Sequence, residues 1–232
     1  MPLFGPRPLP LTSYGYQPPR GATARGWRCT NDECGTGERE PVSRWPFRCR
    51  RCGWPADPDF DQPWAHEALG VELAAEIRGH TGARAVVAQD RLLNWQLKDA
   101  LLRSDAAAAA AARNAIRRLA AARQREDRSW NPVFLVGPAV WDALTAGDLA
   151  GAAEDLCFWL EISVGEGAAE SNSVRHNART VIDTGAKFLA APGGAAHPRA
   201  AEIRTGCLRV AEGAFAVLNP DQQAAIMRMA RA

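Results

Sequence analysis

Four of the six cysteines in this chain of 232 residues form two close pairs, and they carry the most specific chemistry in the sequence. Cys29 pairs with Cys34 and Cys49 with Cys52, spaced C-x4-C and C-x2-C with fourteen residues between the pairs. Thiolates are soft ligands that suit Zn²⁺, and four of them complete a tetrahedral coordination sphere. We therefore predict one structural zinc ion held by these cysteines, with no open position for a substrate.

The residues around the cysteines agree with a metal-binding turn at each pair. Gly35 follows Cys34 and Gly53 follows Cys52, and glycine readily adopts the positive φ that such turns need. A segment of about thirty residues buries too little surface to fold alone, whereas structural zinc contributes roughly 10–16 kcal/mol in zinc-finger peptides. Two disulfides and a rubredoxin-like iron site are the alternatives. The disulfides are disfavoured because the start of the chain lacks the continuous apolar segment of a secretion signal.

Residues 27–54, with four cysteines and two following glycines, resemble the zinc-ribbon group. In that group two cysteine-containing turns hold one zinc ion beside a small antiparallel sheet, so the resemblance implies the same arrangement here. The first pair departs from the group, since it has four intervening residues where two are commoner. Zinc ribbons bind DNA, RNA or protein, or serve only as structural clips, and the resemblance therefore implies no single function.

Basic and aromatic residues interleave in the same segment, a combination used for phosphate contact and base stacking. The candidate nucleic-acid-binding residues are Arg44, Trp45, Phe47, Arg48, Arg50 and Arg51. The alternative is that Trp27, Trp45 and Trp54 form the core of the module and the arginines are solvated. Residues 1–55 hold nine Arg against four Asp and Glu, a net charge of +5, and residues 56–232 carry −3. This bias is weaker than that of a dedicated DNA-binding domain.

The composition changes along the chain and predicts four parts. Six prolines in the first nineteen residues indicate an extended, partly disordered tail at 1–26. The zinc ribbon covers 27–56, and an acidic, proline-containing linker at 57–63 is expected to hold no regular element. An all-helical domain follows at 64–232. No apolar run approaches the roughly 20 residues of a membrane span, so we expect a cytoplasmic protein without a membrane partner.

Apolar residues recur every three or four positions from Trp64 onward, which predicts about eight helices and no strand after residue 56. The helices are expected near 64–77, 83–103, 106–128, 133–146, 148–164, 173–190, 198–218 and 221–231. Ser104-Asp105 should cap the third helix and Ser171 or Ser173 the sixth, with Pro198 in the first turn of the seventh. Cys157 and Cys207 lie on apolar faces and are expected in the core.

Short turns favour antiparallel neighbours, so the predicted fold class is mainly α, built from stacked antiparallel helical hairpins at 83–128, 133–164 and 173–218. The stretch from Ala143 to Glu161 resembles the turn and second helix of a tetratricopeptide repeat (TPR). The resemblance rests on Gly147-Asp148 in the turn, on Ala152 and Ala153 as small packing residues, and on Trp141 in the preceding helix. It implies a TPR-like array whose concave face binds a peptide or protein segment.

The spacing of the turns leaves a second architecture open. Turns near 104, 147 and 194 lie 43 and 47 residues apart, against a TPR period of 34. A plain helical bundle is therefore the alternative to the array.

No motif of a common enzyme class is present in the sequence. The four histidines form no H-x-x-x-H pair, and phosphate-binding, nucleophile-elbow and dinucleotide-binding patterns are missing. Ser171 and His176 lie close together, but an N-cap explains the serine. We expect a non-enzymatic adaptor or regulatory protein that binds another protein through its helical domain. The alternative is a regulator that binds DNA or RNA through the zinc ribbon.

Overall fold

The computed structural model describes residues 27–31, 34, 36–38, 48–58, 63–127, 130–163 and 172–231. This part of the chain is mainly helical, as predicted, and it groups into two compact units, Met1–Ser104 and Asp105–Ala232. The first two helices group with the cysteine module, whereas the sequence-based division places every helix in one domain from residue 64. The predicted tail at 1–26 lies outside the described residues. None of the helices described is both long and apolar enough to cross a lipid bilayer.

A small antiparallel sheet forms the N-terminal part of the first unit. The central strand is β1 (Trp27–Cys29), which pairs with β2 (Gly37–Glu38) on one side and with β3 (Ala56–Pro58) on the other. Gly37 lies opposite Arg28, and a Cβ atom there would come within 2.5 Å of the Trp27 carbonyl oxygen. The narrow approach of β2 to β1 therefore depends on glycine at this position.

Strand β3 corrects the prediction that no regular element follows the cysteines before the first helix. Its prolines and aspartates argued against a strand, yet all three residues pair with β1. β3 is an edge strand, and proline is tolerated there because only one side of the strand needs ladder hydrogen bonds. Ala56 is fully buried, so the segment also contributes to the core of the module.

Helices α1 (Pro63–Gly79) and α2 (Ala83–Leu102) pack against each other as a hairpin. Gly70 lies against the indole ring of Trp95, and a Cβ atom at residue 70 would come within 2.6 Å of that ring. The close packing of the two helices therefore requires glycine. Val86 of α2 is 43 % exposed; the buried apolar positions of this helix are Ala88, Leu97 and Ala100.

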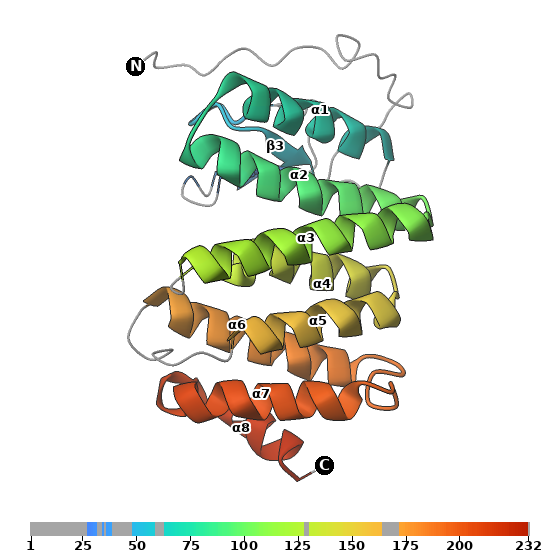
Figure 1. Cartoon of the computed structure of the whole chain (residues 1–232), viewed down its shortest axis with the longest axis vertical. Helices are drawn as coiled ribbons and strands as arrows, with labels where there is room; N and C mark the ends of the chain where they lie inside the picture. Colours follow the sequence, from blue (N-terminus) through green and yellow to red (C-terminus); the bar gives the residue numbers. More distant parts are fainter. Residues whose placement is uncertain are drawn as a thin grey trace. The chain divides into compact units, whose positions relative to one another are not determined.

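In the part of the second unit that the structure describes, six α-helices form two layers. They are α3 (Ala106–Glu126), α4 (Val136–Thr145), α5 (Leu149–Ser163), α6 (Asn172–Ala190), α7 (Ala200–Ala214) and α8 (Pro220–Met229). Figure 1 shows α3, α5 and α7 in one layer, with α4, α6 and α8 behind them. Each helix packs against the next one along the chain and against the one after that. Two short 3-10 helices, η2 (Pro132–Phe134) and η3 (Phe215–Val217), adjoin α4 and α7.

The helix ends agree only in part with the capping residues predicted from the sequence. The Asp105 carboxylate accepts a hydrogen bond from the Ala108 backbone N–H at 2.9 Å and so caps α3, as expected. Gly147 takes φ 75° in the predicted tight turn before α5. Pro198 was expected inside the first turn of α7, but turns continue to Arg199 and the helix begins at Ala200. Ser173 lies within α6 rather than at its cap, and Ser171 lies outside the described residues.

A buried polar network joins α5 to α6 inside the second unit. Trp159 Nε1 donates to Asn177 Oδ1 at 2.8 Å, and Asn177 Nδ2 donates to Ser163 Oγ at 2.9 Å. These pairings satisfy polar groups that would otherwise be costly to bury. Cys157 and Cys207 are both buried in this unit, which confirms the prediction that they are core residues.

Candidate metal centre

The four predicted cysteine ligands come together through the sheet and two turns. Cys29 ends β1, and the Cys34 backbone N–H closes a turn onto the Asn31 carbonyl at 3.0 Å. The second turn is closed by the Gly53 N–H, which donates to the Cys49 carbonyl at 2.8 Å. Gly53 takes φ 74°, the left-handed conformation predicted for the residue after Cys52. Gly35, for which the same conformation was expected, lies outside the described residues.

The sulfur positions fit a single tetrahedral ion. All four Sγ atoms lie within 4.8 Å of one another. The Cys29–Cys52 and Cys34–Cys49 sulfur separations are 3.4 and 3.7 Å. A tetrahedral ion with metal–sulfur distances near 2.3 Å requires sulfur separations of about 3.8 Å. The four cysteines can therefore hold one metal ion, and they leave no tetrahedral position open.

The surroundings of the sulfur atoms shift the pKa values of these cysteines in different directions. Burial raises the pKa of Cys29 and of Cys52. Burial also acts to raise the pKa of Cys34, but hydrogen bonding with Thr36 outweighs it and lowers that pKa to about 7. The Asn31 backbone N–H donates to Cys29 Sγ at 3.4 Å, a contact that favours the thiolate. Because metal ligands must be deprotonated, an ion that binds here releases protons and binds more weakly in acid.

Arg48, next to Cys49, ties the metal module to α1. Its Nε donates to Glu72 and its Nη1 to Glu76, two carboxylates of α1 that are buried. Its Nη1 also donates to the Gly53 carbonyl at 3.1 Å, within the turn that holds Cys49 and Cys52. One guanidinium therefore contacts both the metal-binding turn and the first helix.

Arg84, in the first turn of α2, completes this ion-pair cluster. Its Nε donates to Glu76 at 2.6 Å, and its guanidinium lies 5.0 Å from the centroid of the Trp54 ring. Burial alone would raise the pKa of Glu76, but hydrogen bonds from Arg84 and Arg48 outweigh it and hold that pKa below its usual value. Glu76 is only 2 % exposed and stays ionised because these two arginines compensate its charge.

The structure describes three of the six candidate nucleic-acid-binding residues; Arg44, Trp45 and Phe47 lie outside the described residues. Arg48 is engaged by the buried carboxylates of α1. Arg50 and Arg51 are exposed between Cys49 and Cys52. Trp27 and Trp54 are buried, which agrees with their alternative role as core residues of the module.

Sequence reasoning missed the carboxylate cluster. Glu72 and Glu76 lie three and seven positions after Leu69, which places them on the same face of α1 as the buried Leu69 and Leu73. Two acidic residues on an apolar face are the signal that could have indicated buried ion pairs. The identity of the basic partners could not follow from this pattern, since Arg48 comes from a different element.

No protein-family model, curated protein or solved structure matches this chain.

We predict that purified protein contains about one metal ion per chain and that Cys49→Ser combined with Cys52→Ser removes it. Two thiolates of four remain in this variant, which is too few for tight tetrahedral binding. The measurement is elemental analysis by mass spectrometry after dialysis. Cys157→Ala with Cys207→Ala is the matched control and should retain the ion, because these cysteines are buried in the second unit. Full retention of the ion in the serine variant would refute the site.

We predict that Glu76→Gln lowers the stability of the first unit by about 2 kcal/mol at pH 7, because the part-buried guanidiniums of Arg48 and Arg84 lose a charged hydrogen-bond acceptor. Faster hydrogen exchange of the α1 amides measures this loss. Glu212→Gln, at an exposed position of α7, is the control and should change stability by less than about 0.5 kcal/mol.

The same variant has a defined dependence on pH. Since the folded-state pKa of Glu76 is lowered, its carboxylate stabilises the fold above the ordinary value of 4.5. That contribution disappears as the pH falls through the lowered pKa. The difference between native protein and Glu76→Gln should therefore shrink below pH 4.5 in thermal unfolding; a difference that grows in acid would contradict the ion-pair assignment.

Proposed function

We propose that the protein is a non-enzymatic adaptor that binds a partner protein through its helical part, with zinc in a structural role. The observation that carries the proposal is an open groove of about 840 Å³ on the second unit, lined by α5 and α7. The groove is the extended recessed surface that such a partner needs. The four-cysteine centre offers no free coordination position and is therefore suited to holding structure.

Zinc is the ion that the donor set favours. Four cysteine sulfurs provide soft ligands in a closed tetrahedral arrangement, which zinc prefers and which magnesium and calcium do not. The strands of the attached sheet have only two or three residues each, and so small a sheet is marginal on its own. A structural ion supplies the cross-link that the module needs, in the manner of a zinc ribbon.

The packing of α3 to α8 supports a TPR-like helical array as the binding scaffold. Helices two places apart in the chain lie side by side in the same layer, which is the packing of stacked hairpins. Ala152 and Ala153, the small residues of the TPR-like stretch, are fully buried against neighbouring helices. In this proposal the layer formed by α3, α5 and α7 presents the groove to the partner.

Nucleic-acid binding through the metal module is the second candidate, and the exposure of Arg50 and Arg51 favours it. Both arginines lie in the turn between Cys49 and Cys52, where two adjacent positive charges can contact a phosphate backbone. They also have a local role, since four thiolates around Zn²⁺ carry a net charge of −2 that nearby arginines offset. Arg51 Nη1 donates to the Cys34 carbonyl at 3.3 Å, which is consistent with this local role.

We predict that the full chain, used as bait in extracts of its native host, captures a partner protein that survives nuclease treatment. Cross-links to that partner should fall on α3–α8. A photoreactive cross-linker is required, since Lys98 and Lys187 are the only lysines. The Cys49→Ser/Cys52→Ser variant should still be cross-linked through the helices. Capture of no protein, or cross-links confined to residues 27–58, would refute the adaptor function.

The second candidate predicts that Arg50→Glu with Arg51→Glu weakens salt-dependent binding to single-stranded RNA or duplex DNA. Two lost phosphate contacts should reduce the slope of log affinity against log salt by about 2. Fluorescence anisotropy of labelled oligonucleotides between about 20 and about 200 mM salt measures this slope. Arg78→Glu with Arg118→Glu, at exposed helical positions, is the control. If the native chain binds no nucleic acid even at low salt, this candidate is wrong.

A further inference from the structure

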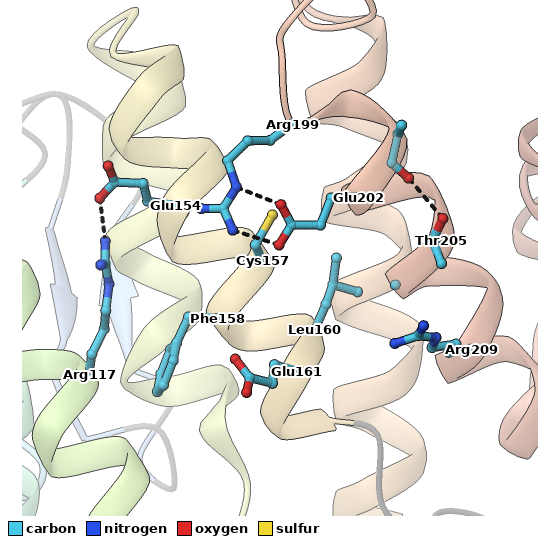
Figure 2. Close-up of a pocket in the computed structure, with 12 residues that line it drawn as sticks. Arg117, Glu154, Cys157, Phe158, Leu160, Glu161, Arg199, Glu202, Thr205 and Arg209 are labelled. Atoms are coloured by element: carbon cyan, nitrogen blue, oxygen red, sulfur yellow. Dashed lines mark hydrogen bonds and ion pairs between the residues drawn. The ribbon is translucent and has the colours of Figure 1, made fainter.

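The groove on the second unit is formed by facing sides of α5 and α7, with Arg117 of α3 at one edge (Figure 2). Leu160 and Gly206 bring the two helices together, since a Cβ atom at residue 206 would lie 2.9 Å from the Leu160 side chain. Its volume of about 840 Å³ falls in the upper part of the range for ligand sites, about 300–1,000 Å³. The groove is therefore large enough for several residues of a peptide.

Six charged side chains line the groove, three of each sign. They are Arg117, Arg199, Arg209, Glu154, Glu161 and Glu202. A ligand of one sign, such as an inorganic anion or a metal cation, would meet repulsion from three of these groups. The lining therefore selects a ligand that carries both positive and negative charge.

Two of the arginines are already paired with groove carboxylates. Arg199 contacts Glu202 through two hydrogen bonds of 2.7 and 2.6 Å, and Arg117 donates to Glu154 at 3.0 Å (Figure 2). Burial raises the pKa of Cys157 to about 12, against the opposing effect of the Arg199 charge. A pKa this high disfavours the thiolate, which is the form of cysteine that acts as a nucleophile.

Arg209 and Glu161 differ from the other charged residues of the groove. Neither forms a hydrogen bond or an ion pair within the described part of the chain, and both side chains are exposed. Arg209 projects from α7 and Glu161 from α5, on the side of Leu160 away from the Arg199–Glu202 pair (Figure 2). Arg209 lies seven residues after Glu202, about two helical turns further along α7. One end of the groove is thus internally paired, and the other presents one charge of each sign.

We propose that the groove binds an extended segment of a partner protein that pairs an acidic side chain with Arg209 and a basic side chain with Glu161. This inference rests on the proposed adaptor function and adds the recognition chemistry. Successive side chains of an extended peptide point to opposite sides, so two neighbouring residues of opposite charge can face the α5 and α7 walls of the groove. The half-buried side chain of Phe158 in the groove lining supplies apolar contact area for the peptide stem.

Selection from a random peptide library displayed on phage, with the full chain as bait, tests the proposal. The enriched peptides should carry an acidic and a basic residue at a fixed spacing and in a fixed order. Each single change, Arg209→Gln or Glu161→Gln, should weaken a selected peptide by about fivefold, since an exposed ion pair contributes up to about 1 kcal/mol. Both positions are exposed, so these variants should keep the native circular dichroism spectrum.

The charge-swapped variant Glu161→Arg/Arg209→Glu is the decisive bait. It should select peptides with the order of the two charges reversed, a result that a purely structural role of these residues cannot produce. Glu212→Arg/Arg228→Glu, at exposed positions outside the groove, is the matched control and should select the original order. Enrichment of one sign of charge alone, or an order unchanged by the swap, overturns the proposal.

Two further results distinguish a peptide-binding groove from a small-molecule site and from a binding surface elsewhere on the helices. Complete displacement of a selected peptide by millimolar free lysine and glutamate would identify a small-molecule site and overturn the peptide assignment. Capture of a native partner whose cross-links avoid α5 and α7 would also overturn it, while leaving the adaptor function intact.

Discussion

The arrangement of the first unit depends on four sulfur atoms held within 4.8 Å of one another. Strands of two or three residues cannot fix the turns that carry these cysteines, so the zinc ion that we propose has to do so. The second of these turns positions Arg48, which compensates the buried charges of Glu72 and Glu76 on α1. Burying two carboxylates is costly without that partner. The metal centre therefore determines the docking of the helical hairpin as well as the fold of the sheet.

In the described part of the second unit, buried ion pairs hold two helices together. Arg113 of α3 donates to Asp155 of α5 at 2.9 Å, and Arg117 reaches the same carboxylate, which is 1 % exposed. Burial raises the pKa of Asp155 in spite of the hydrogen bonds from these arginines. The cluster fixes how α3 lies on α5. Gly151 is part of this arrangement, because a Cβ atom there would overlap the Arg113 guanidinium at 2.2 Å.

The sequence was most informative where the cause of structure is local. The Asp105 cap of α3, the positive φ of Gly53 and the proximity of the four cysteines follow from neighbouring residues and from ligand chemistry, and all three could be predicted. Strand β3 could not, because its existence depends on pairing with β1 rather than on its own composition. The charged groove could not be predicted from the sequence either. Its lining comes from three helices, and no periodic pattern within one helix indicates which residues face another.

The two units together show why the number of arginines is a poor guide to function in this chain. Arg48, Arg113 and Arg117 are committed to buried carboxylates, so they contribute to the fold and add nothing to a basic binding surface. Arg50 and Arg209 are exposed and make no hydrogen bond or ion pair within the described residues. Exposed arginines such as these are the ones available to bind a ligand. Breaking a buried ion pair costs more free energy than a new contact at the surface contributes. Arg209 differs from Arg50 in facing an unpaired carboxylate across a groove, and this juxtaposition favours a ligand of mixed charge over a uniformly anionic one.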